Sequence, residues 1–173
     1  MKLTNYGITL QRLTEDKIEQ VRNWRNDPKI ALFMEHQDYI DPEMQIQWFR
    51  KINNDNNFFF IIVYEEKEIG LINLKDIDYT TKEGEGGIFI FDDRYLNSDV
   101  SFRATLCMID FGFETLHLKS ISAHILTTNK RAILFNKSLG FIKSNNQEGI
   151  LNQLYHLTVE EYLRERERVI RLF

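Results

Sequence analysis

The sequence predicts an α/β (α+β) fold in which one mixed sheet is flanked by helices, and three observations predict it. Apolar residues at helical spacing dominate the first fifty positions, and strand-like apolar runs separated by charged turns begin at Phe58. Helix and strand patterns then alternate to the C-terminus. No repeat or Pro/Gly-rich linker interrupts residues 1–173, a length typical of one domain, so we expect a single domain.

The N-terminal segment is predicted to pair a short strand with helices. Ile8 and Leu10 alternate with polar residues, which indicates an edge strand. Thr14 is a typical helix N-cap, and the helix that follows should end before Pro28. A short helical piece is expected at residues 30–34.

Asp41 and Pro42 form a typical start for the next helix, because an aspartate caps and a proline fits the first turn. Its inward face is expected to hold four apolar residues, Met44, Trp48, Phe49 and Ile52.

The second half is predicted to supply most of the sheet. The expected strands are 58–64, 69–74, 86–91, 120–126, one from Phe141, and 150–157. The expected helices are 100–115, 129–139 and 160–173. Gly140 should end the second of these, since glycine readily takes the left-handed conformation after a helix.

Composition excludes several classes of function. The net charge is −4 and the pI about 5.6, so nucleic acid is not expected as a partner. No apolar run reaches the roughly 20 residues of a membrane span, and no signal peptide is evident, so a cytoplasmic protein is expected. With one cysteine, Cys107, and four histidines without ligand spacing, no metal is expected.

Two motifs in order along the chain carry a family resemblance. Asn129-x-x-Ala132 is followed by Leu139-Gly140-Phe141, and a strand, polar turn and long helix precede them. This region resembles the GNAT superfamily of acyl-CoA-dependent N-acyltransferases. The WRNDP segment at 24–28 and Ile69-Gly70 look like the branch of ribosomal-protein N-terminal acetyltransferases and bacterial amino-sugar acyltransferases. The resemblance runs over nearly the whole chain and implies a single GNAT-like domain, residues 1–173, with a central mixed, mostly antiparallel sheet.

The resemblance implies acetyl-CoA or another short-chain acyl-CoA as co-substrate. Its pantetheine arm is expected between two splayed strands, 85–91 and 120–126, and its pyrophosphate at the N-terminus of the helix from Val100. The expected cofactor contacts are Phe89, Ile90, Phe91, Asn97, Ser98, Ser101, Phe102, Arg103, Asn129 and Phe135. The family's glycine-rich turn is replaced here by a loop containing Asp99, whose charge Arg94 or Arg103 could offset.

The chemistry needs a neutral amine and a proton for the departing thiolate. Glu85 stands where many relatives keep a glutamate base, and His36 is the next candidate. Where many relatives have a tyrosine acid this chain has Phe135, so either another donor, Tyr95 or a water, replaces it or the thiolate leaves unassisted. His124 is equally consistent with a hydrogen-bonded structural histidine and a catalytic one.

The acceptor site is expected in the variable N-terminal half and after the first hairpin. Its predicted residues are Trp24, Arg25, His36, Asn73, Lys75 and Asp76. Arg25 is a candidate fork for a phosphate or carboxylate.

Three functions remain open. The favoured one is acylation of the amine of a nucleotide-linked amino sugar (dTDP or UDP) in surface-polysaccharide pathways. A protein N-terminal acetyltransferase and an inactive CoA-binding module are the alternatives. The C-terminal helix could cover a sheet edge or form a homodimer.

Overall fold

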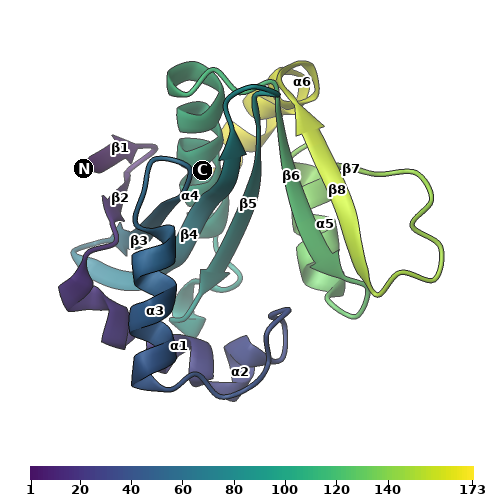
Figure 1. Cartoon of the computed structure of the whole chain (residues 1–173). Coiled ribbons are helices and arrows are strands. Elements are labelled where there is room, and N and C mark those ends of the chain that lie inside the picture. Colours follow the sequence, from purple (N-terminus) through teal and green to yellow (C-terminus); the bar gives the residue numbers. More distant parts are fainter.

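An eight-stranded sheet forms the centre of the computed structural model, which describes residues 1–173 (Figure 1). The strand order is β1-β2-β3-β4-β5-β6-β8-β7, and only β5 and β6 are parallel neighbours. The strands are β1 (Lys2–Asn5), β2 (Ile8–Arg12), β3 (Phe58–Tyr64), β4 (Lys67–Asp78), β5 (Glu83–Ile90), β6 (Ser120–Leu126), β7 (Ile142–Lys143) and β8 (Asn152–Thr158). The predicted mixed, mostly antiparallel sheet is confirmed.

Helices cover the two faces of the sheet unequally. The α-helices are α1 (Ile18–Asn26), α2 (Pro28–Ala31), α3 (Pro42–Ile52), α4 (Val100–Asp110), α5 (Lys130–Ser138) and α6 (Val159–Ile170). Shorter helical segments are η1 (Glu15–Lys17), η2 (Asp93–Tyr95) and the π-helical η3 (Phe111–Thr115). Figure 1 shows α1 and α3 on one face, here called the α3 face, and α4, α5 and α6 on the other, the α4 face.

Each face has its own apolar core because strand side chains alternate between the faces. The α4 face holds a cluster of 28 buried residues, including Ile72 and Leu74 of β4. The α3 face holds a cluster of eight, including Trp24, Phe59 and Leu71. On β4 the next residues on the α3 face after Leu71 are therefore Asn73 and Lys75. No helix lies over the α3 face of β6 and β8 (Figure 1).

Two expectations for the N-terminal half are wrong. Ile8 and Leu10 lie on β2, which is an internal strand, because the polar segment Lys2–Asn5 pairs with it as the true edge. Met44 is 40% exposed rather than inward. Gln45 is buried in its place and donates its amide to the Ile18 carbonyl oxygen at 2.9 Å.

The C-terminal helix is fastened to the domain by a buried carboxylate. Asp110 of α4 accepts hydrogen bonds of 2.5 Å from the hydroxyls of Tyr6 and Tyr162. Arg166 of α6 donates to the same carboxylate at 3.2 Å. The group joins the β1–β2 turn, α4 and α6, and each charge in it has a partner, as a buried ion pair requires.

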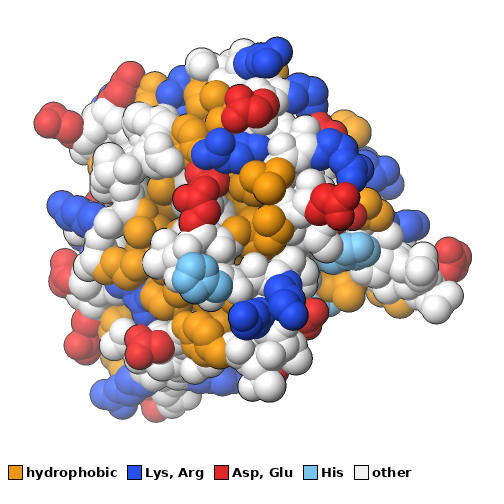
Figure 2. Space-filling view, turned by 90° about the horizontal axis from the view of Figure 1, so that it is seen from above, with side chains coloured by type: hydrophobic (Ala, Val, Ile, Leu, Met, Phe, Trp, Pro, Cys, Tyr) orange, Lys and Arg blue, Asp and Glu red, His pale blue; other side chains and the backbone are white.

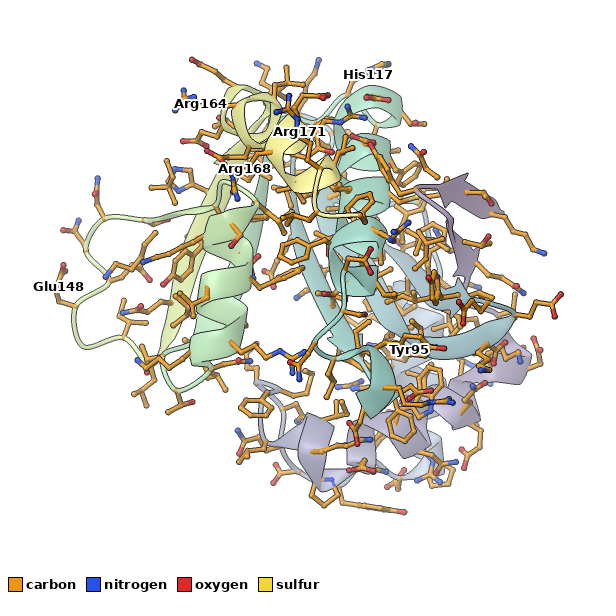
Figure 3. All side chains as sticks on the ribbon, turned by 180° about the vertical axis from the view of Figure 1, so that it is seen from behind. Tyr95, His117, Glu148, Arg164, Arg168 and Arg171 are labelled. Carbon is orange, nitrogen blue, oxygen red and sulfur yellow. The ribbon has the colours of Figure 1, made fainter.

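One side of α6 remains exposed. Thr158 and Glu161 form a capping box at its start, and Tyr162 and Val169 are buried, while Leu163 is 60% exposed. Figure 3 shows Arg164, Arg168 and Arg171 along this helix, far from Tyr95 at the other end of the domain.

On the face that Figure 2 presents, basic and acidic side chains are interspersed around apolar patches. This face therefore has no extended field of one sign. None of the helices has the length and apolarity needed to cross a bilayer.

Candidate active site

The sheet opens between its two parallel strands. Their ladder has only three pairs and ends at Glu85↔Ser122. Beyond that pair, β5 stays paired with β4 and β6 with β8, while β5 and β6 diverge (Figure 1). Backbone groups on their inner edges are thus left for a ligand, since such groups need hydrogen-bond partners when buried. The sequence prediction of splayed strands is confirmed.

Two glycines, one on β4 and one on β5, allow close packing around the diverging strand β5. A Cβ on Gly70 of β4 would lie 2.2 Å from the carbonyl oxygen of Phe89, so only glycine permits the observed approach of β4 to β5. A Cβ on Gly87 would lie 2.9 Å from Oδ1 of Asn73 on the α3 face. Gly87 therefore keeps the space beside Asn73 open.

A charged cluster lies at the closed end of the divergence. The Glu85 carboxylate forms a hydrogen bond of 3.0 Å between Oε2 and His124 Nδ1, and a salt bridge of 3.1 Å between Oε1 and Lys75 Nζ. The three side chains come from β5, β6 and β4. Glu85 is 22% exposed and His124 41% exposed, so the cluster is accessible from the α3 face.

Lys75 is the fixed positive charge of this cluster. Burial opposes its charge, but the carboxylates of Glu85 and Asp76 outweigh burial and raise the pKa of Lys75 above its ordinary value. Its Nζ lies 3.3 Å from Asp76, whose side chain is 70% exposed at a residue with φ of +50°. Lys75 is therefore charged at neutral pH and orients Glu85.

Arg25 is a cation without a carboxylate partner. Its guanidinium lies 5.5 Å from the ring centre of Trp48 and forms no hydrogen bond or salt bridge within the chain. Burial lowers the pKa of Arg25, and no acidic group counteracts that effect. A half-buried guanidinium in this state is suited to bind an anion.

The strand register places Arg25 on the same face of the sheet as the charged cluster. Trp48 packs edge-on against Phe59 at 5.2 Å, and Phe59 is the register partner of Asn73. Asn73 in turn pairs with Gly87, one row from the Lys75↔Glu85 pair. Rows on one face are about 7 Å apart, so Phe59 and Trp48 connect the unpaired guanidinium to the face that carries the cluster.

The N-terminus of α4 offers free backbone donors on the opposite face. The N–H groups of Asn97, Asp99, Ser101 and Phe102 have no acceptor, whereas that of Val100 donates to the Ser98 hydroxyl at 3.3 Å. Four free donors at a helix N-terminus suit a pyrophosphate. Because these are backbone groups, the missing family glycines do not remove them.

Arg131 was missed by sequence reasoning. From α5 its guanidinium donates to the Leu96 carbonyl oxygen, which places a cation beside the donors at the start of α4. Asn129, the predicted cofactor residue, caps α5 by accepting from Ala132 N–H at 3.0 Å, and its Nδ2 has no acceptor. Only the adjacent run Asn129-Lys130-Arg131 could have signalled this cation.

Phe102 and Phe135 join α4 to α5 with ring centres 4.7 Å apart. The predicted cofactor residues Phe102 and Phe135 thus close the α4 face behind the diverging strands. The residues that surround the divergence fit an acyl-CoA, which supplies the activated acyl group when bound.

Several predicted contacts are corrected by the structure. Arg103 points away from the α5 side: it donates to Asp99 and the Tyr6 carbonyl oxygen and lies 4.3 Å from the Phe173 ring centre. It does offset the charge of Asp99, as expected. Trp24 is buried and stacks on Phe91 at 5.4 Å, so it is a core residue and not an acceptor contact.

The strand residues predicted to touch the cofactor can do so only through their backbone. Phe89 packs against Trp24, and Ile90 is buried in the core of the α4 face. Their side chains point to the two faces and not along the divergence.

Tyr95 and His36 are not part of the charged cluster. The Tyr95 ring packs against Tyr64 of β3 at 5.6 Å, and Figure 3 shows Tyr95 beside the start of α4 on the side away from α5. His36 is exposed in the loop after α2 and makes no hydrogen bond. That loop is fixed at Ile40, whose N–H and carbonyl oxygen both bond to the Asn26 side chain at 2.8 Å.

An apolar hollow of about 430 Å³ lies at the open end of the divergence. It is lined by Leu32, Phe33, Gln37, Leu126, Thr127, Thr128 and Leu151. The loop after α2 and the ends of β6 and β8 therefore meet around a space of a size typical for small-molecule binding. No group of three His, Cys, Asp or Glu side chains is arranged to hold a metal ion.

The chain belongs to the GNAT family. Residues 8–142 match the family model described as Acetyltransferase (GNAT) domain, and the diverging strands with free donors at α4 agree with it. The protein is therefore an N-acyltransferase that uses an acyl-CoA as co-substrate.

The curated relatives and solved structures are consistent with this family. Acetyltransferase PseH of Campylobacter jejuni is 28% identical over 137 residues, which cover 77% of this chain and 79% of that protein. Spermidine N-acetyltransferase from Vibrio cholerae, solved with CoA and spermine, has a TM-score of 0.80 at 21% identity and covers 92% of this chain and 99% of its own. An acetyltransferase structure from T. thermophilus has a TM-score of 0.79 at 16% identity, covering 99% of this chain and 97% of its own.

Proposed function

We propose that this enzyme transfers an acetyl or short hydroxyacyl group to the amine of a nucleotide-linked amino-deoxy sugar, a dTDP- or UDP-sugar, in surface-polysaccharide biosynthesis. The observation that carries the proposal is the unpaired, half-buried guanidinium of Arg25, on the same face as the Glu85 cluster. An anionic acceptor would place its diphosphate at Arg25 and its amine at the cluster. The similarity to Acetyltransferase PseH is compatible with a small-molecule acceptor.

The charges of the site disfavour a polyamine acceptor. A polyamine carries several positive charges and is best bound by unpaired carboxylates. Here the Glu85 carboxylate is already paired with Lys75, and Arg25 adds a second cation nearby. The likeness to spermidine N-acetyltransferase, at 21% identity, concerns the fold.

The nucleoside of the acceptor and the phosphates of CoA also have suitable surroundings in the structure. The apolar hollow at the open end offers room for a nucleoside. The free N–H groups at α4 and the guanidinium of Arg131 are placed for the CoA phosphates. Asn73 lies one row from the Lys75 and Glu85 of the cluster and on the same face.

CoA thiol release tests the proposal. Acetyl-CoA and a hydroxybutyryl-CoA are each offered with dTDP- and UDP-linked amino sugars, spermidine and N-terminal peptides. We expect turnover with at least one nucleotide-linked amino sugar and none with spermidine. Turnover restricted to peptides would favour a protein N-terminal acetyltransferase, and the absence of thiol release with every amine would leave an inactive CoA-binding module.

A further inference from the structure

The orientation of His124 has a consequence for proton transfer. His124 lies on β6 two residues beyond Ser122, the last residue of β6 paired with β5. Its side chain is nevertheless joined to β5, because Nδ1 lies 3.0 Å from Oε2 of Glu85. The imidazole therefore spans the two strands at the point where they begin to diverge.

The bond to Glu85 selects one form of the neutral imidazole. A carboxylate only accepts hydrogen bonds, so the proton shared with Glu85 resides on Nδ1. Nε2 then carries the lone pair and is the nitrogen able to accept a proton. Histidines whose second nitrogen is bound to a carboxylate act as general bases in this way.

Glu85 itself is less available. One carboxylate oxygen forms the salt bridge with Lys75, and the other forms the hydrogen bond with His124. Each oxygen keeps a second lone pair, but the Glu85 side chain is only 22% exposed, whereas Nε2 of the 41%-exposed His124 has no partner.

We propose that Nε2 of His124 is the base that deprotonates the acceptor amine, and that Glu85, held by Lys75, positions His124 for that role. The proposal rests on the N-acyltransfer proposed for this site. It assigns the catalytic contact to His124, and it makes Glu85 and Lys75 positioning residues.

The proton and electron balance is complete. The acceptor enters as an ammonium and gives one proton to Nε2. The neutral amine attacks the thioester carbonyl carbon, a C–N bond forms, and the C–S bond breaks with its electron pair on sulfur. The second nitrogen proton passes through water to the thiolate, which leaves as the free thiol, and His124 returns its proton to solvent.

The groups that face His124 come from β5 and β8. Glu85 bonds the imidazole and also holds Lys75, while the register partner on β8 is the uncharged Leu154. The next histidine on that face, His156, is bonded to Ser144.

Kinetics of His124→Gln, Glu85→Gln and the control His156→Gln test the proposal, with acetyl-CoA and whichever amine acceptor is turned over. We expect His124→Gln to lower kcat by about 100-fold or more, because a general base contributes roughly 10²–10⁴ in rate. The same variant should abolish the rising limb of the plot of rate against pH. The KM for acetyl-CoA should change less than twofold. Glu85→Gln, whose amide oxygen still accepts from Nδ1, should keep the limb, and His156→Gln should behave as wild type.

The contrary result is a rising limb kept by His124→Gln and lost by Glu85→Gln, which would make Glu85 the direct base. Turnover insensitive to His124 would overturn this inference alone, whereas no turnover with any acceptor would overturn the proposed function as well.

NMR of imidazole nitrogens provides a readout that needs no substrate. We expect the neutral His124 of the wild type to carry its proton on Nδ1, and Glu85→Ala to shift the proton toward Nε2. Protonation on Nε2 in the wild type would contradict the proposed orientation. Thermal unfolding of each variant checks that it folds.

Discussion

Glu85 and His124 form a hydrogen bond of 3.0 Å across the two parallel strands, immediately beyond the last pair of their ladder. The bond places an ionisable pair where backbone pairing stops. The unpaired guanidinium of Arg25 lies on the same face of the sheet, against Trp48, which packs on Phe59. The proposed anionic acceptor rests on these two features, the Glu85–His124 pair and the unpaired cation of Arg25.

Arg25→Ala is expected to raise the KM for a nucleotide-linked amino sugar about 10- to 100-fold. Hydrogen bonds to charged groups contribute about 1.5–3 kcal/mol, and each 1.4 kcal/mol is tenfold. The KM for acetyl-CoA should stay unchanged in steady-state assays. Arg50→Ala, which removes an exposed cation of α3, is the matched control, and an equal effect of both variants would remove Arg25 from the site.

Arg131→Ala is expected to raise the KM for acetyl-CoA about tenfold with little effect on the acceptor, because the guanidinium lies beside the free donors of α4. The effect should shrink as ionic strength increases. Lys137→Ala, an exposed cation at the other end of α5, serves as control. Unaltered acetyl-CoA kinetics in Arg131→Ala would show that the phosphates lie elsewhere.

Gly70→Ala should mainly lower the stability of the fold, whereas Gly87→Ala should mainly raise the KM for the acceptor. At Gly70 the added Cβ meets a backbone oxygen at 2.2 Å, so we expect a loss of about 1–3 kcal/mol in the free energy of unfolding. At Gly87 it meets the movable Asn73 side chain at 2.9 Å, so stability should fall by less and the acceptor KM should rise. Denaturant titrations and kinetics of both variants check this, and a catalytic defect confined to Gly70→Ala would contradict it.

Cys107 should be unreactive in the folded enzyme. Burial, aided by the Asp110 carboxylate, raises the pKa of its thiol from 9.0 to about 11. The unfolded thiol ionises at lower pH, so the stability contributed by the protonated thiol is present below pH 9 and is lost as pH rises toward 11. A thiol reagent at pH 8 should label the protein only after guanidinium unfolding; rapid labelling of the native protein would disprove the burial.

The sequence predicted the strands and helices because turns, caps and apolar runs are local signals, whereas the divergence of β5 and β6 was expected only from the family resemblance. It could not pair Glu85 with His124, which lie 39 residues apart, since the pairing depends on the register of β5 and β6. Nor could the sequence show that Arg131, rather than Arg103, lies beside the free N–H donors of α4. Contacts with Tyr6 and Phe173, at the two chain ends, turn Arg103 away from the α5 side, and no local pattern encodes them. Trp24 belonged to the core because Phe91 follows β5 on the same face.

The most direct test compares a nucleotide-linked amino sugar with the same amino sugar lacking its nucleotide, in wild type and Arg25→Ala. We expect the wild type to favour the nucleotide-linked acceptor in kcat/KM by about 100-fold or more, and the preference to fall at least tenfold in Arg25→Ala, because the guanidinium has no carboxylate partner within the chain and is proposed to bind the diphosphate. Equal kcat/KM for the two acceptors, or a preference unchanged in Arg25→Ala, would contradict the assignment of Arg25 to the acceptor diphosphate.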